Sequence, residues 1–360
     1  MRAFRFVNLL ILLACLAACA DSRYYLQSVS GHLQMMQAAR PLTQWLADDE
    51  VAPALKQRLE LAQRIRKFAV AELGLPDNAS YQRYADLQRR AVVWNVVAAP
   101  ALSLKLKTWC FPVTGCVVYR GYFSEADART QAQALRDEGL EVSVYGVPAY
   151  STLGWLNWAG GDPLLNTFIH YPEGELARMI FHELAHQVLY VKDDSVFNES
   201  FATAVERLGG ERWLAQRGGA AAQLEYATFD TRRRQLRALS GPTRARLSAI
   251  YAQADAPGAD RSQLLGAKQQ VMDDFRARYT VLKTAWGGYS GFDGWVANAN
   301  NAALGAQAAY DEMVPGFEAL FEREGRCWPQ FYDAVRQLAH MPAPERARAL
   351  KHLSGDFTRG

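Results

Sequence analysis

Two histidines four residues apart constrain the fold of this chain more than any other feature of its sequence. His182 and His186 belong to the pentapeptide His-Glu-Leu-Ala-His, inside a run whose apolar residues recur at helical spacing from about Gly174 to Tyr190. Residues four apart lie on one face of a helix, so both imidazoles can reach one metal ion. Glu183 follows the first histidine, where its carboxylate can take a proton from metal-bound water. The pattern therefore predicts a helix that carries a catalytic metal site, with Zn²⁺ as the expected ion.

A catalytic zinc site needs a third protein ligand. The four other histidines, at positions 32, 170, 340 and 352, do not extend the motif. The segment Asn198-Glu-Ser-Phe-Ala202 resembles the Asn-Glu-Gly-Phe-Ala segment that carries the glutamate ligand in gluzincin aminopeptidases, so we expect Glu199 to be the third ligand. Glu206 lies about two helical turns further on and is the alternative ligand, or a partner of a ligating histidine. Capping of a helix N-terminus is the structural alternative for either glutamate.

The first 18 residues have the anatomy of a secretory signal. A basic start with Arg2 and Arg5 precedes an apolar stretch that is shorter than the roughly 20 residues of a membrane span. The run Leu16-Ala-Ala-Cys19 resembles the bacterial lipobox, in which the cysteine is acylated and becomes the first residue of the mature protein. A plain cleaved signal, with Cys19 incidental, is the alternative.

A lipobox implies a location in the bacterial envelope. Acyl chains on Cys19 would hold the protein at a membrane while its folded part faces the periplasm. Ala20 stands where many enteric bacteria place the aspartate that retains lipoproteins in the inner membrane, so the outer membrane is favoured. The formal charge of +3 falls by two when Arg2 and Arg5 leave with the signal, and a balance so near neutral indicates no nucleic-acid partner.

Three cysteines lie beyond the signal and the anchor. Cys110 and Cys116 enclose the turn-rich segment Phe-Pro-Val-Thr-Gly, and in an oxidising compartment we expect them to form a disulfide. A metal pair is the alternative, but no further cysteine or histidine lies close to them in the sequence. Cys327 is expected to be a buried free thiol.

The pattern of apolar residues predicts a predominantly helical α+β fold. Short apolar, β-branched runs at 91–97, 117–119 and 141–147 surround a predicted helix at about 124–138, which indicates a small mixed sheet with a covering helix. The segment 255–260 interrupts two long helical stretches, which we expect to pack as an antiparallel hairpin. The predicted parts are a signal peptide at 1–18, an N-terminal helical layer at 19–78, a mixed α/β, zincin-like region at 79–220 and a C-terminal helical region at 221–360.

Several segments together resemble the bacterial family described as putative aminopeptidases. They are Tyr24–Gln27, Tyr119–Phe123, Ala149–Trp155, the predicted zinc helix and Asn300–Ala302, and the resemblance covers nearly the whole mature chain. It implies a zinc peptidase, first of all an aminopeptidase, that acts on peptides in the envelope. A zinc endopeptidase of envelope proteins and a non-catalytic zinc lipoprotein that serves as a docking surface are the alternatives.

Further residues are candidates for substrate contacts. Tyr310 follows the Asn300 block on a predicted helix and is a candidate donor to the oxygen that becomes negative during peptide hydrolysis, with a place in the core as its alternative. The segment from Val147 to Trp155 could supply a strand edge for an extended peptide, with Tyr150, Ser151 and Thr152 near it; an ordinary turn is the alternative. Arg120 is a candidate for binding a substrate carboxylate, against a structural ion pair.

Overall fold

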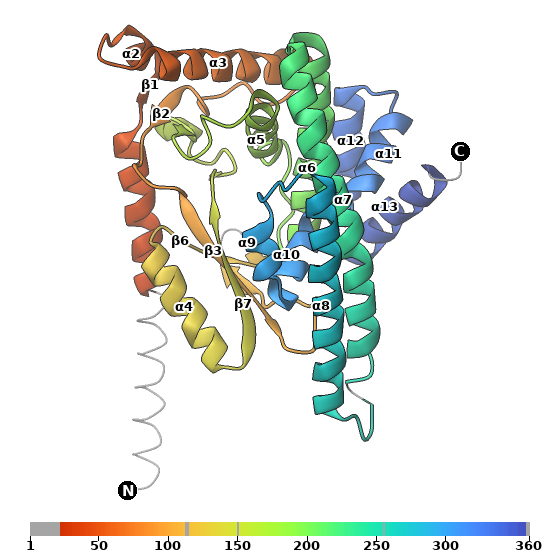
Figure 1. Ribbon diagram of the computed structural model, residues 1–360. Coiled ribbons are helices and arrows are strands. Elements are labelled where there is room, and N and C mark those ends of the chain that lie inside the picture. Colours follow the sequence, from red (N-terminus) through yellow and green to blue (C-terminus); the bar gives the residue numbers. More distant parts are fainter. Residues whose placement is uncertain (1–21, 112–114, 150, 255, 358–360) are drawn as a thin grey trace, which may run out of the picture.

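The computed structural model describes residues 22–111, 115–149, 151–254 and 256–357. Cys19 and Tyr150 lie outside these ranges. A first helix at 22–38 leads to β1 (Arg40–Pro41), α2 (Leu42–Ala47) and α3 (Pro53–Leu73). Helix α3 begins with a proline in its first turn and ends at Gly74, whose φ of 62° is in the left-handed region that glycine adopts at helix ends. In Figure 1 the first helix runs along one side of the molecule and α3 lies across its top.

A three-stranded antiparallel sheet lies at the centre of the molecule, in the order β6-β3-β7. Its strands are β3 (Val93–Pro100), β6 (Arg120–Tyr122) and β7 (Leu140–Val147). On one face Val96 and Ala98 pack against α4 (Glu125–Asp137), and on the other Val97 and Ala99 pack against α10 (Asn301–Asp311). Because β3 alternates its side chains between two covered faces, both sets of residues are buried.

The predicted strand at 117–119 is divided in the structure, and this prediction was wrong. Val117 ends β5 (Gly115–Val117), which pairs with β4 (Trp109–Phe111) in a separate two-stranded sheet, whereas β6 begins at Arg120. Val118 and Tyr119 lie between the two strands and belong to neither. Opposite positions of β4 and β5 carry Cys110 and Cys116, which form the expected disulfide.

Two adjacent helices, α5 (Glu173–Ala185) and α6 (Ser195–Arg217), form the middle of the main apolar core. Helix α5 ends five residues before the predicted Tyr190, because the chain turns back at His186 to Val188. Helix α6 begins at Ser195 instead of Asn198, after Asp194, whose side chain accepts a hydrogen bond from Phe197 N. A third short sheet, β1-β2-β8, lies beside this pair, with β2 (Arg83–Ala85), β8 (Leu164–Leu165) and the 3₁₀ turn η1 (Asn157–Ala159).

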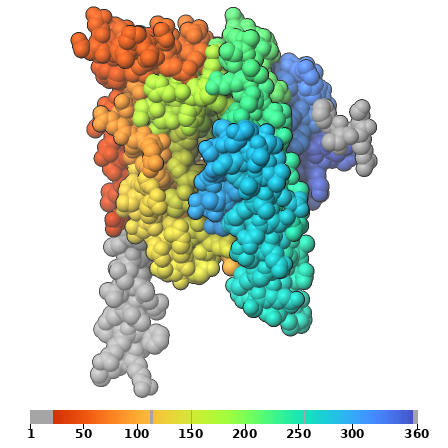
Figure 2. All heavy atoms as spheres, in the orientation of Figure 1, coloured from red at the N-terminus to blue at the C-terminus, as the bar shows by residue number. Residues whose placement is uncertain are grey.

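The C-terminal part is helical, as predicted. Helices α7 (Ala220–Tyr251) and α8 (Arg261–Ala285) form the expected antiparallel hairpin, and its far end projects beyond the body of the molecule (Figures 1 and 2). The remaining helices are α9 (Asp293–Ala297), α10, α11 (Val314–Arg323), α12 (Trp328–Ala339) and α13 (Ala343–Phe357). The main core includes residues from Met35 to Leu350, and the fourfold division of the chain stays a prediction. Cys327 is a free cysteine as expected, but it is half-buried and not fully buried.

Within the described residues, no helix has the length and apolar character that a membrane span requires.

Candidate metal centre

Three side chains converge where α5 and α6 pack together. His182 Nε2 lies 3.2 Å from His186 Nε2, and Glu199 Oε2 lies 3.4 Å from the first of these nitrogens and 3.7 Å from the second. Ligands bound at 2.0–2.1 Å around a tetrahedral zinc ion are about 3.3–3.4 Å apart, so the three separations fit one ion. The predicted donor set is thus brought together, and the cluster could hold a metal.

The cluster is buried, and its charges act strongly on one another. Burial alone would raise the pKa of Glu199, but the charge of His186 and hydrogen bonds from His182 lower it to about 2. Burial would lower the pKa of His182, yet hydrogen bonds to Glu199 and Glu206 raise it well above its ordinary value. In the metal-free protein these groups therefore stabilise a positive charge at the point where a cation would bind.

Glu183 lies in the wall of the same cavity, next to the first histidine. Burial raises the pKa of this carboxyl group, the two histidines oppose the rise, and the Glu199 and Glu206 carboxylates add to it. A buried carboxylate with a raised pKa binds a proton more readily than an exposed one, which is the property that a proton-transferring base needs.

The short connection between α5 and α6 is held by specific hydrogen bonds. The side chain of Asn198 accepts from Val191 N at 2.8 Å and donates to Val191 O at 2.7 Å. Asp194, which caps α6, also forms an ion pair with the buried Arg346 of α13 at 2.7 Å. These contacts fix the start of α6, so that Glu199 faces the histidines one turn later. Because Asp194 is the cap, neither Glu199 nor Glu206 has that role.

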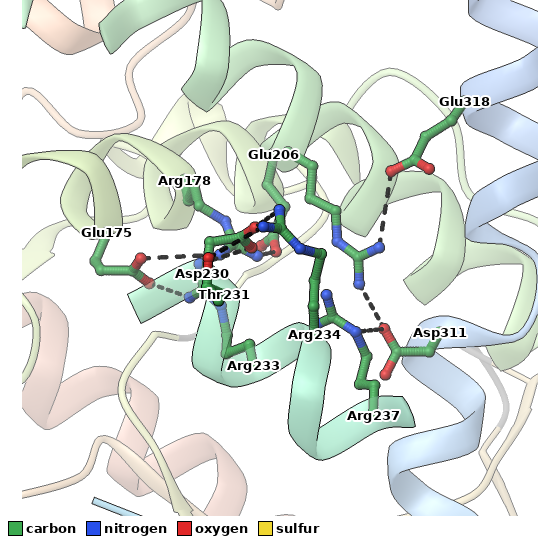
Figure 3. A network of polar contacts seen from close by, with 11 residues as sticks. Glu175, Arg178, Glu206, Asp230, Thr231, Arg233, Arg234, Arg237, Asp311 and Glu318 are labelled. Carbon is green, nitrogen blue, oxygen red and sulfur yellow. Dashed lines mark hydrogen bonds and ion pairs between the residues drawn. The ribbon is translucent and has the colours of Figure 1, made fainter. Parts of the chain in front are cut away.

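Glu206 lies behind His182 and outside the donor triangle. Its Oε2 is 3.1 Å from His182 Nδ1, and its Oε1 accepts a hydrogen bond from the buried Arg178 (Figure 3). Burial would raise the pKa of Glu206, but the Arg178 charge and the hydrogen bond with His182 hold it far below its ordinary value. An ionised carboxylate on the second ring nitrogen directs the first nitrogen toward a metal. The geometry therefore gives Glu206 the second of its predicted roles, as the partner of a histidine.

A cavity of about 390 Å³ opens in front of the three donors, and we call it the metal-centre cavity. Tyr310 of α10 lines it, with its ring centre 6.4 Å from that of His182 and parallel to within 25°. Burial and the Glu199 charge raise the pKa of Tyr310 well above 10, so its hydroxyl keeps its proton and can donate it in a hydrogen bond. Much of the remaining wall is apolar or aromatic, including Tyr24, Phe111, Val117, Tyr119, Phe123 and Leu153.

The predicted substrate residues have different positions in the structure. Ser151 lines the metal-centre cavity, whereas the backbone N–H of Thr152 donates to the carboxylate of Asp162 at 3.1 Å. The prediction of a strand edge as far as Trp155 was wrong, because β7 ends at Val147 and turns follow. Tyr150 lies outside the described residues.

Arg120 lies beside the metal-centre cavity, between two of its lining residues. Its guanidinium stacks on the ring of Tyr24, 4.1 Å from the ring centre. That contact joins the first helix to β6. A role for Arg120 in binding a substrate carboxylate stays a prediction.

Two polar residues that support the donors, Arg178 and Asp162, were not predicted from the sequence. Arg178 could have been found, since it lies four residues before His182 on the same helix, as a charged residue among apolar ones. Asp162 is separated from the motif by 20 residues and carried no local signal. It contacts Gln187, which follows His186, through a hydrogen bond of 3.4 Å.

Because Asp162 is buried, we expect the free energy of unfolding to depend on pH. Burial raises its pKa from 3.8 to about 6, although hydrogen bonds from Thr152 oppose the rise. Between these values the folded protein holds a proton that the unfolded chain has lost, so the free energy of unfolding should fall as the pH rises from about 4 to 6. Asp162→Asn should remove this fall, which is on the order of 2 kcal/mol between pH 4.5 and 7. Urea unfolding at pH 4.5 and 7 measures it. The exposed Asp333→Asn is the control, and equal pH dependence in all three proteins would contradict the prediction.

The fold and the donor set define an α+β protein, mostly helical, with a buried site that could hold one metal ion. Residues 23–350 match the family model described as Putative aminopeptidase, and the chain belongs to that family. Searches of curated proteins and of solved structures found no match.

Proposed function

We propose that this protein is a zinc-dependent peptidase and, by its family, an aminopeptidase. The observation that carries the proposal is the triangle of His182, His186 and Glu199 donor atoms beside the buried carboxyl group of Glu183. A zinc ion in this triangle would polarise the scissile carbonyl and lower the pKa of a water molecule. A site that served structure alone would have no need of a proton-accepting carboxylate in its wall.

The residues of the chain have distinct tasks in this proposal. Glu183 takes a proton from the attacking water and passes it to the amine that leaves. Glu206 keeps His182 in one orientation and one tautomer. The apolar and aromatic walls exclude water and favour substrates with apolar side chains beside the scissile bond.

A digest of a peptide library by the zinc-loaded protein tests this proposal. We expect release of single residues from the N-terminus, with a preference for apolar residues. Each peptide is offered with a free and with an acetylated N-terminus, and the products are identified by mass spectrometry. A protein that contains one equivalent of zinc and leaves the whole library intact would contradict the proposal.

An endopeptidase is the second candidate, and one observation favours it. Among the described residues, the carboxylates that line the metal-centre cavity are Glu183 and Glu199, and both already have tasks. A free α-amino group is a cation that a further carboxylate would bind. An endopeptidase needs no such group, so it should cut acetylated and free peptides equally, at internal bonds.

Tyr310 is our candidate for the hydrogen-bond donor to the oxygen that becomes negative during hydrolysis. Tyr310→Phe removes only the hydroxyl group, and we expect kcat to fall about 100-fold while KM changes little. Tyr119→Phe is the matched control, because Tyr119 is a second half-buried tyrosine in the wall of the same cavity. Steady-state kinetics of the two variants should differ. Equal kcat values for Tyr310→Phe and the unaltered protein would exclude the proposed role.

We also propose that Cys19 is acylated and that the protein is attached to the periplasmic side of a bacterial membrane. The lipobox-like run supports this, as do the exposed apolar side chains on the first helix at Tyr25, Leu26, Val29 and Leu33. Cys19→Ala should lose palmitate labelling and move from the membrane fraction to the soluble fraction. Cys327→Ala is the control, and labelling that persists in Cys19→Ala would rule out this anchor.

A further inference from the structure

A second cavity, of about 380 Å³, lies on the other side of Tyr310 from the metal centre, and we call it the hairpin pocket. Its walls come from α7, from α10, from β7 and from the segment that includes α9. Tyr310 lines both cavities, and it is hydrogen-bonded to Tyr145, which lines the hairpin pocket. Because a shared side chain separates them, the pocket is distinct from the metal-centre cavity and adjacent to it.

One cation in the hairpin pocket is only weakly compensated. Arg237 has its Nε 3.6 Å from Asp311 Oδ1 (Figure 3). That oxygen already accepts a closer hydrogen bond from Arg207. Among the described residues Asp311 is the only ion-pair partner of Arg237. Burial and the neighbouring Arg207 lower the pKa of Arg237, which indicates that its charge lacks favourable surroundings.

The other cation of the pocket is neutralised by its neighbours. Arg233 donates to Glu175 at 2.5 Å and lies 3.4 Å from Asp230 (Figure 3). Of the two guanidinium groups in the described lining, Arg237 is thus the one whose nearest ion-pair partner, Asp311 at 3.6 Å, is shared with another arginine. An arginine in such a position binds a carboxylate through two parallel hydrogen bonds.

The wall around Arg237 is aromatic and aliphatic. Tyr145, Phe292, Trp295 and Leu236 line the pocket, and small residues of α10 face them. Surfaces of this kind bind an aromatic or branched apolar group, and the volume is within the range of small-molecule sites. The Asp311 carboxylate in the same wall would repel a doubly charged anion such as phosphate, which favours a ligand with one negative charge.

We propose that the hairpin pocket binds a small organic monocarboxylate with an aromatic or branched apolar group, its carboxylate on Arg237 and its apolar group against Trp295 and Phe292. A free or N-acylated amino acid, or the C-terminal residue of a short peptide, has this chemistry. The proposal does not rest on the peptidase function, since it depends on residues outside the donor triangle. A bound ligand would contact Tyr310 and thereby link the two cavities.

Calorimetric titration of the zinc-loaded protein with N-acetyl-L-phenylalanine tests the proposal, and its uncharged amide serves as the second probe. We expect the acid to bind at least ten times more tightly than the amide, and Arg237→Gln to remove this difference. Trp295→Ala should weaken the binding of both probes. Phe111→Ala, in the wall of the metal-centre cavity alone, is the control that should bind the acid normally.

Each variant is first compared with the unaltered protein by thermal unfolding. Arg207 remains beside Asp311 in Arg237→Gln, so we expect this variant to fold. Arg237→Lys keeps the positive charge and should retain part of the preference for the acid. If the acid binds folded Arg237→Gln as tightly as it binds the unaltered protein, it binds elsewhere, for example at the metal, and the proposal is overturned. Equal affinity of the unaltered protein for acid and amide overturns it as well.

Discussion

Glu183→Gln should lower kcat for peptide hydrolysis about 1000-fold and leave the metal content unchanged. Glutamine has nearly the same shape as glutamate but cannot accept a proton at neutral pH, and positioned general bases contribute rate factors of about 10²–10⁴. Glu183 is not one of the three candidate metal ligands, so its substitution should not release the ion. Steady-state kinetics and metal analysis of the same preparation measure both quantities.

A matched control separates this effect from any change of charge. Glu138→Gln makes the same substitution at an exposed position. The kcat of this variant should equal that of the unaltered protein. Full activity of Glu183→Gln would exclude Glu183 as the base. A loss of zinc together with activity would instead give Glu183 a role in metal binding, which contradicts the proposed assignment of ligands.

Glu206→Gln should lower both the stability of the fold and the affinity for the metal. The side chains of Arg178 and Glu206 are 8% and 15% exposed, and among the described residues the substitution leaves Arg178 with the more distant Glu175, at 3.8 Å, as its ion-pair partner. Removing one partner of a buried ion pair costs about 3–5 kcal/mol of unfolding free energy. Because the charged acceptor on His182 is lost as well, we expect zinc to bind about 10–100 times more weakly.

A double variant separates these two effects. Arg178→Met with Glu206→Leu replaces the ion pair by apolar side chains of similar size, so most of the unfolding free energy should return. Zinc affinity should stay low, because His182 still lacks its carboxylate. Urea unfolding of the metal-free proteins and zinc titration against a competing chelator measure the two quantities. If the double variant recovered both the unfolding free energy and the zinc affinity, Glu206 would affect zinc binding only by stabilising the fold.

Local sequence patterns predicted the parts of the site that lie within one or two helices. The spacing of His182 and His186 requires only a helix, whereas Glu199, on the next helix, was expected from the resemblance of its segment to gluzincin aminopeptidases. The disulfide between Cys110 and Cys116 depends on a short turn, and the α7–α8 hairpin on a single interruption of a helical pattern. In each case the interacting residues are close in the chain, so their spacing contains most of the information.

The remaining parts depend on contacts between distant segments. The start of α6 depends on the hydrogen bonds of Asn198 with Val191, which no helical pattern reveals. The apolar run at 117–119 reads as one strand, but only Val117 pairs, with Trp109 of β4, and the next strand begins after the run, at Arg120. Glu206 meets Arg178 across two helices, and Arg237 lies against a helix more than 60 residues away in the chain. The spacing of apolar residues predicts that such residues are helical, but it does not predict which residues they contact.

Diffraction at the zinc absorption edge, from crystals of the purified soluble portion, tests the central claim most directly. We predict one anomalous peak, with His182 Nε2, His186 Nε2 and Glu199 Oε2 each at about 2.0–2.2 Å from it and one position open to the cavity. A peak bound by Glu206 in place of Glu199, or the absence of any peak at these histidines in zinc-containing crystals, would contradict the account.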